Sequence, residues 1–278
     1  MKTTIICPTD FSDAANNAVE YSAKLSQIIE AELTLVNVQR VTPVAAAVSM
    51  GNGIANDIRE NSIIASGKLK EMSVEINRMF KIPTKYEVDI TTKSLSKTIS
   101  SLGKNNTIIV MGTNGADNLS QFFFGTNTYN VIEKTECPVL LVPENVSFET
   151  YTKILYPIIY ENPEESALEQ FYEFGKHFEA QFTFLHISKK DTDKTKNIFN
   201  TIKEDTEKYF NGKLKINFER VFSDNIDDAI DNFIIENPID LMMIEEHHRN
   251  LLERIFLKKP LLSALSITAS FPIFVVHS

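Results

Sequence analysis

The sequence predicts an α/β protein made of two tandem copies of one domain, each a five-stranded parallel sheet with helices on both faces. Short runs of Val, Ile and Leu alternate with amphipathic stretches, which is typical of βαβ units. The length of 278 residues is more than one domain usually takes. The second half of the chain also repeats the first.

The repeat is visible in an alignment that needs no gaps from the first strand to the second. Pro8 falls on Pro157, Ala18 on Ala167 and Ala31 on Ala180. Further matches pair Thr107-Ile108-Ile109-Val110 with Leu241-Met242-Met243-Ile244, and Cys137-Pro138-Val139 with Phe271-Pro272-Ile273. Only two copies are present, which argues against a solenoid. We expect domains at residues 1–143 and 151–278, joined by 144–150.

In the first copy, strands are expected at about residues 3–7, 32–38, 84–90, 107–111 and 139–142. Helices are expected from Ser12 to Glu30, Asp57 to Phe80, Ser94 to Leu102 and Thr126 to Lys134. The first helix spaces its apolar residues at helical intervals and begins at a capping residue, Ser12 or Asp13. The low-charge segment 41–56 is expected to be a loop, either a lid or a simple connection.

The second copy is expected to place its strands near residues 152–156, 181–187, 214–221, 240–244 and 273–276. The stretch that corresponds to the loop 41–56 is shorter and charged, from Ser188 to Lys196.

Composition excludes several classes of protein. A net charge of −9 argues against a general binder of nucleic acid or of anionic membranes, since both need a concentrated basic face. The sequence contains no apolar run of about eighteen residues, so no membrane span is predicted. The apolar part of the N-terminal segment is too short for a signal peptide. We therefore expect a cytoplasmic protein. Cys7 and Cys137 each precede a proline and fit reduced thiols better than a disulfide.

Three glycines and a hydroxyl follow the fourth strand of the first copy. The chain reads Gly112-Thr113-Asn114-Gly115, then nine residues, then Gly125-Thr126. Backbone N–H groups without bulky side chains can approach phosphate oxygens closely, and a helix start adds the positive end of its dipole. A Walker loop with its lysine is absent, and Asn56 spoils the dinucleotide pattern that begins at Gly51.

Ligands of parallel α/β sheets lie at the carboxyl ends of the strands. Three strand ends of the first copy are expected to converge there, together with this motif. Asp10 follows the first strand and can accept hydrogen bonds from ribose hydroxyls. The backbone N–H and C=O near Val38, at the end of the second strand, can read an adenine edge. Met111 and Gly112 end the fourth strand. The sequence thus predicts a nucleotide site at this edge.

The run from Gly112 to Thr126, followed by a helix and Cys137-Pro138-Val139-Leu140, resembles the nucleotide signature of the universal stress protein family. The resemblance implies a Rossmann-like domain of the adenine nucleotide alpha hydrolase type. It covers both copies in fold and only the first in motif.

Members of that family that bind ATP have an aspartate at the position of Asp10, contact adenine through the second strand and hold the triphosphate on the glycine motif. The resemblance and the strand ends together give the predicted binding residues Pro8, Thr9, Asp10, Val38, Met111, Gly112, Thr113, Gly115, Gly125, Thr126 and Asn127. ATP is the expected ligand, with AMP and ADP left open and Mg²⁺ or Mn²⁺ bound only through the nucleotide. Ala116 departs from the family, where a basic residue is frequent, and should weaken phosphate affinity.

Structural alternatives remain at each of these positions. Gly112 and Gly115 can serve a tight turn, while Asp10 or Thr126 can cap a helix.

The second copy lacks the motif. Ile159 replaces Asp10, and the residues that replace the glycines and the hydroxyl are Glu246, Arg249, Lys259 and Pro260. We expect this copy to bind no nucleotide, because side chains fill the phosphate seat and the pair Glu245-Glu246 repels a triphosphate. His247 and His248 beside the glutamates leave a metal site as a minor alternative. No catalytic residue is identified, and no metal ligand is assigned.

The expected function is a stress-response module that senses nucleotide through one site. A slow ATP hydrolase and a nucleotide-free interaction scaffold are the alternatives. Family members commonly dimerise through their last strands, so the two copies are expected to pair within the chain through residues 139–142 and 273–276. A homodimer and an unidentified protein partner remain open.

Overall fold

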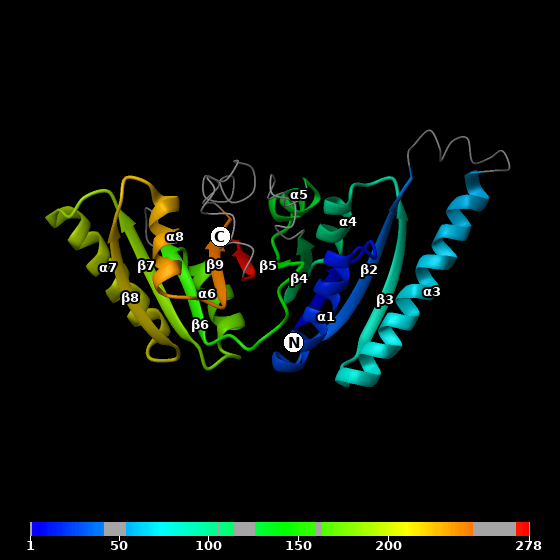
Figure 1. Cartoon of the computed structure of the whole chain (residues 1–278), viewed down its shortest axis with the longest axis horizontal. Helices are drawn as coiled ribbons and strands as arrows, with labels where there is room; N and C mark the ends of the chain where they lie inside the picture. The colour runs from blue at the N-terminus through cyan, green and yellow to red at the C-terminus, as the bar shows by residue number, and fades with distance from the viewer. Residues whose placement is uncertain are drawn as a thin grey trace. The chain divides into compact units, whose positions relative to one another are not determined.

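The computed structural model describes residues 2–41, 54–104, 106–113, 126–158, 163–246 and 271–277. The chain divides into two compact units, the first ending at Phe148 and the second beginning its main part at Glu149. Each unit is described by itself below, with its elements labelled as in Figure 1.

The first unit is a parallel sheet in the order β3-β2-β1-β4-β5. Its strands are β1 (Thr4–Pro8), β2 (Glu32–Arg40), β3 (Thr84–Thr91), β4 (Thr107–Thr113) and β5 (Val139–Pro143). Its helices are α1 (Asp13–Ile28), α3 (Ile54–Phe80), α4 (Leu95–Leu102) and α5 (Thr126–Lys134). The winding reverses between β1 and β4, and this is the point at which doubly wound sheets bind ligands.

The second unit has the same order of strands, β8-β7-β6-β9-β10, and all of its pairs are parallel. The strands are β6 (Lys153–Ile158), β7 (Gln181–Ser188), β8 (Lys215–Phe222), β9 (Leu241–Glu245) and β10 (Ile273–Val276). The helices are α6 (Glu165–Gly175), α7 (Asp193–Phe210) and α8 (Ile226–Glu236). The predicted fold class, two tandem Rossmann-like repeats, is confirmed.

Several boundaries in the first unit differ from the prediction, and β4, for example, ends at Thr113 rather than at Met111. Strand β2 continues to Arg40, and helix α3 begins at Ile54 rather than Asp57. Residues 54–56 are therefore helical and not part of the loop. The prediction missed them because nothing in their polarity marks the start of a long helix. Residues 42–53 of that loop lie outside the described residues, and the predicted role as a lid falls on them.

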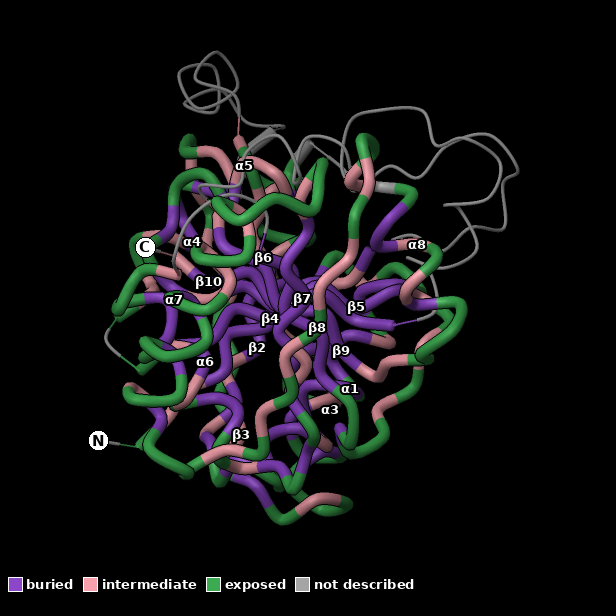
Figure 2. The backbone as a smooth tube through the Cα atoms, turned by 90° about the vertical axis from the view of Figure 1, so that its left-hand side faces the viewer, coloured by how far each residue is buried: buried purple, intermediate pink, exposed green. Residues whose placement is uncertain are grey.

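Each unit is held together by a buried sheet, and Figure 2 shows the strands largely in the buried colour. The first core is mostly aliphatic, with Ile5, Leu33 and Val110 fully buried. The second is rich in aromatic rings, since Phe171 packs against Tyr156 and against three further phenylalanines. Such close-packed cores fix the strand ends in place.

Gly112 allows β4 and α1 to approach closely. A Cβ atom added at Gly112 would lie 2.2 Å from the carbonyl oxygen of Ala14 in the first turn of α1. The alternative that this glycine serves a structural purpose is thus supported, although the purpose is helix packing rather than a tight turn. The contact fixes the start of α1 against the end of β4.

Cys7 and Cys137 are free and buried. Within the described ranges, no helix combines the length and apolar character that crossing a membrane would need.

Candidate functional site

A cavity of about 400 Å³ lies at the carboxyl ends of β1 and β2, where α3 forms its other wall. Its volume is within the range of small-molecule sites. The strand side is formed by Asp10, Phe11, Asn37, Val38, Gln39, Arg40 and Val41, and the helix side by Ile58, Asn61, Ile64, Ala65 and Lys68. Apolar side chains and a few polar groups therefore face one space, at the edge where ligands of this topology bind.

The loop from β1 to α1 holds Asp10 in a defined place. The Asp10 carboxylate accepts the backbone N–H of Ser12 at 3.0 Å, and the Thr9 hydroxyl accepts that of Phe11 at 3.0 Å. Phe11 has a φ of 66°, an uncommon left-handed conformation that these two bonds stabilise. The cap of α1 is Ser12, whose hydroxyl accepts the N–H of Ala15.

Asp10 is thus not the helix cap, and its carboxylate remains suited to a ligand. Partial burial acts to raise the pKa of Asp10, but hydrogen bonds from the Ser12 hydroxyl and backbone outweigh it and the pKa lies below its usual value. The group is ionised at neutral pH. An ionised carboxylate only accepts hydrogen bonds, as binding the hydroxyls of a sugar requires.

Positive charge reaches the same cavity from two elements. The ammonium group of Lys68, in α3, lies 4.9 Å from the centre of the Phe11 ring, a cation–π distance. Arg40 ends β2 and is exposed. Both cations line the cavity, within a chain whose net charge is −9.

A chain of hydrogen bonds crosses the floor of the cavity. The Asn37 amide donates to the carbonyl of Thr9 at 2.8 Å. The Gln39 amide donates to the Asn37 side-chain oxygen at 3.3 Å and to the Asn61 carbonyl at 3.1 Å. The chain of bonds ties β1, β2 and α3 together.

The predicted site residues occupy three regions. Asp10 and Val38 line the cavity, and Pro8 and Thr9 lead into it from β1. Met111, Gly112 and Thr113 are the last three residues of β4. Thr126 begins α5 and Asn127 is exposed in its first turn, while Gly115 and Gly125 lie outside the described residues.

Two of these predicted residues have structural partners. The Thr113 hydroxyl donates to the Val142 carbonyl at 3.3 Å, and the Thr113 carbonyl accepts the N–H of Glu144. Thr9 donates its N–H to the carbonyl of Val36. Both residues therefore have a structural role, because they hold the ends of β1 and β4 to the neighbouring backbone.

The sequence prediction placed Asn37 and Gln39 at the strand end beside Val38 without giving them a binding role, and it missed the α3 residues of the cavity. Asn37 carried a signal, because it is a polar residue in the apolar run Leu35-Val36-Asn37-Val38 and is only 8% exposed. The α3 residues carried none, since helical spacing does not tell which strand end a helix will face.

In the second unit, a phenylalanine of α7 packs on the residue that aligns with Asn37. His186 aligns with Asn37 and lies beside Arg220 in the register of β7 and β8. Phe199 of α7 covers both, with its ring 5.8 Å from that of His186 and 5.3 Å from the Arg220 guanidinium. Burial, and secondarily the charge of Arg220, lower the pKa of His186.

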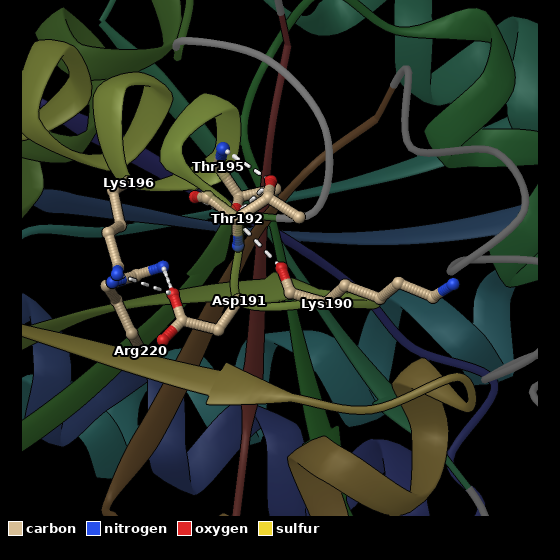
Figure 3. A network of polar contacts seen from close by, with 6 residues as sticks. All are labelled: Lys190, Asp191, Thr192, Thr195, Lys196 and Arg220. Atoms are coloured by element: carbon tan, nitrogen blue, oxygen red, sulfur yellow. Dashed lines mark hydrogen bonds and ion pairs between the residues drawn. The ribbon is translucent and has the colours of Figure 1, made fainter.

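Figure 3 shows how the charged stretch after β7 is ordered. Arg220 donates to the Asp191 carboxylate at 3.2 Å, and Lys196 lies 3.7 Å from the same oxygen. Thr192 and Thr195 cap α7 reciprocally. These contacts fix α7 and hence Phe199.

Glu245 differs from its expected role. It aligns with Met111, is 1% exposed and accepts a hydrogen bond from the Tyr156 hydroxyl. Burial raises the pKa of Glu245 to about 7. The prediction that Glu245 and Glu246 form a repelling pair is therefore wrong for Glu245, because a sheet packed on both faces takes its side chain inside.

Among the residues that the structure describes, no group of three or more His, Cys, Asp or Glu side chains is placed to hold a metal ion. His247 and His248 lie outside those residues.

The strand order, with its reversal between β1 and β4, defines a doubly wound α/β protein. The chain belongs to the universal stress protein family, whose family model matches residues 1–143. It is 28% identical over 152 residues to the universal stress protein MJ0577 of Methanocaldococcus jannaschii. The alignment covers 50% of this chain and 93% of that protein.

Similarity in structure extends over both repeats. A universal stress protein from Archaeoglobus fulgidus matches with a TM-score of 0.72 and 18% identity, covering 99% of this chain and 98% of that chain. At this identity the likeness shows the fold alone, and it shows that fold across the whole chain.

Proposed function

We propose that this protein binds ATP in the first repeat and responds to stress by signalling nucleotide occupancy to a partner. One observation carries the proposal: the cavity at the carboxyl ends of β1 and β2 is lined by Asp10 and by the backbone strand end at Val38. The base would lie between β2 and α3, and the ribose at Asp10. The triphosphate would extend toward the end of β4 and the start of α5.

The charges of the cavity support an anionic ligand. Ala116 removes the basic residue that is frequent at its position in ATP-binding members of the family. Lys68 and Arg40 provide positive potential at the cavity itself. We propose that they offset part of that loss.

Binding is favoured over hydrolysis by the state of Asp10. A general base works best when its pKa is near the working pH, whereas hydrogen bonds keep the pKa of Asp10 below its usual value. We propose that Asp10 holds a ribose and does not activate water.

We propose that the second repeat is free of nucleotide. Phe199 covers His186 and Arg220 where the first repeat has its cavity, and the Glu245 side chain is buried at the position of Met111. This half would act structurally, pairing with the first through β5 and β10. We further propose a cytoplasmic protein, consistent with its two free thiols.

Equilibrium binding of labelled ATP tests the proposal, comparing the natural chain with Asp10→Ala and Gly115→Glu. Asp10→Ala should weaken binding about tenfold, since it removes a charged acceptor. Gly115→Glu should weaken it further, because a carboxylate would then face the phosphates. Lys24→Ala, whose side chain pairs with Glu20 on α1, is the control and should leave binding unchanged. Equal retention of ATP by all four proteins would refute the proposal.

A further inference from the structure

The orientation of the Gln39 side chain is fixed by its partners. Its Nε2 atom donates to Asn37 Oδ1 at 3.3 Å and to the backbone carbonyl of Asn61 at 3.1 Å. A carboxamide nitrogen has two hydrogens, and these two bonds use both.

Backbone carbonyls at both ends of this chain of bonds determine which atom is nitrogen. The Asn37 amide nitrogen must face the carbonyl of Thr9, 2.8 Å away, because a carbonyl cannot donate. Asn37 therefore presents its oxygen to Gln39. The Asn61 carbonyl independently requires a donor, so Gln39 must present nitrogen to both.

Oε1 is consequently the side-chain atom of Gln39 that is available to a ligand, and this atom only accepts hydrogen bonds. Within the described part of the chain, no donor is found for it. Gln39 lines the cavity beside Val38, at the end of β2. A base bound there would meet an acceptor that cannot turn into a donor without breaking two hydrogen bonds.

We propose that Gln39 makes the site select a base with an exocyclic amino group over one with a carbonyl oxygen at that place. The inference rests on the proposed function and names the residue that sets its base specificity. An amino group donates to Oε1, whereas a carbonyl oxygen leaves two acceptors facing each other, and an unpaired polar group in a binding site lowers affinity markedly. Asn37 is a positioning residue, since it acts only through Gln39.

The experiment compares ATP with inosine triphosphate, which carries a carbonyl oxygen where adenine has its amino group. Affinities for both are measured by calorimetry on the full chain and on Gln39→Met. The natural chain should prefer ATP. Gln39→Met should lower the ratio of the two affinities about tenfold, mainly by weakening ATP, because its thioether offers only a weak acceptor of similar length.

Gln27→Met is the matched control, since the Gln27 amide donates to the carbonyl of Phe80 away from the cavity. It should keep the ratio of the natural chain. Gln39→Lys presents only donors and should move the preference toward inosine triphosphate. Circular dichroism confirms that each variant is folded.

The outcomes distinguish a failure of the proposed role of Gln39 from a failure of the proposed nucleotide site. An unchanged ratio in Gln39→Met and Gln39→Lys, or equal affinities in the natural chain, would overturn the role of Gln39 and leave the nucleotide site standing. A natural chain that binds neither nucleotide would overturn the proposed function, and the inference with it.

Discussion

Gly112 lies where β4 passes the first turn of α1, and its lack of a side chain permits that contact. A methyl group there would overlap the carbonyl of Ala14, which belongs to the helix backbone and cannot rotate away. The same turn of α1 follows the loop that holds Asp10. A residue in the predicted phosphate motif therefore also positions the start of α1 and the adjoining loop of Asp10, where we propose that the ribose binds.

Gly112→Ala is expected to destabilise the protein by about 2 kcal/mol, because the backbone of α1 must move. Thermal unfolding measures the change. Gly67→Ala is the control: Gly67 lies inside α3 with nothing within 4 Å of a Cβ atom, so alanine should stabilise by up to about 1 kcal/mol. Equal effects of the two substitutions would contradict the packing role.

At the level of residues, the sequence predicted positions better than roles. Asp10 and Val38 line the cavity where strand ends were expected to meet, while their binding of a nucleotide stays a prediction. The glycine spacing predicted a phosphate contact and was silent on packing against Ala14. The direction of an amide such as Gln39 depends on partners from three elements and cannot be predicted from a pattern in one.

Strand β9 ends in a buried acid, and this makes the stability of the second repeat dependent on pH. Burial raises the pKa of Glu245 from 4.5 to about 7, while the unfolded chain has the ordinary value. Between those values the folded state binds the proton more tightly than the unfolded state. The protonated acid costs little when buried, so stability should fall as the pH rises through this range.

Glu245→Gln should remove this dependence, because glutamine stays neutral and can still accept from the Tyr156 hydroxyl. We expect little difference from the natural chain near pH 4.5 and a gain of roughly 3 kcal/mol at pH 8. Urea unfolding at both pH values measures it. Glu246→Gln makes the same change at the less buried neighbour, and an identical profile for both variants would contradict the account.

Helix α7 depends on its start, where Thr192 and Thr195 exchange hydrogen bonds. Thr192→Ala should destabilise the second repeat by about 1 kcal/mol, since it removes the hydroxyl that accepts the N–H of Thr195. Denaturant unfolding followed by circular dichroism tests this. Thr201→Ala, on the exposed surface of the same helix, should be neutral or slightly stabilising; a loss as large as that of Thr192→Ala would argue against the cap.

The elements themselves could be predicted because each has its own period. The strand boundaries of both repeats agree with the alternation of apolar runs to within about two residues, which is the usual uncertainty of such boundaries. The start of α3 was missed because Ile54, Ala55 and Asn56 continue a loop-like composition. The cavity wall formed by α3 follows from tertiary packing, which local periodicity does not contain.

At the scale of the whole molecule, one fold occurs twice with different contents. Both units have the same strand order, which the repeat of Pro8 at Pro157 and of Ala31 at Ala180 predicted. The first has a cavity beside Asp10, and in the second Phe199 packs on His186 at the equivalent strand end. We therefore expect a duplicated fold to contain one nucleotide site.

The stoichiometry of ATP binding tests this asymmetry most directly. Isothermal titration of the full chain, first stripped of nucleotide, should give one site per chain, and Asp10→Ala should weaken that site without revealing another. Two sites per chain, or a site that Asp10→Ala and Gly115→Glu both leave unaltered, would contradict the account.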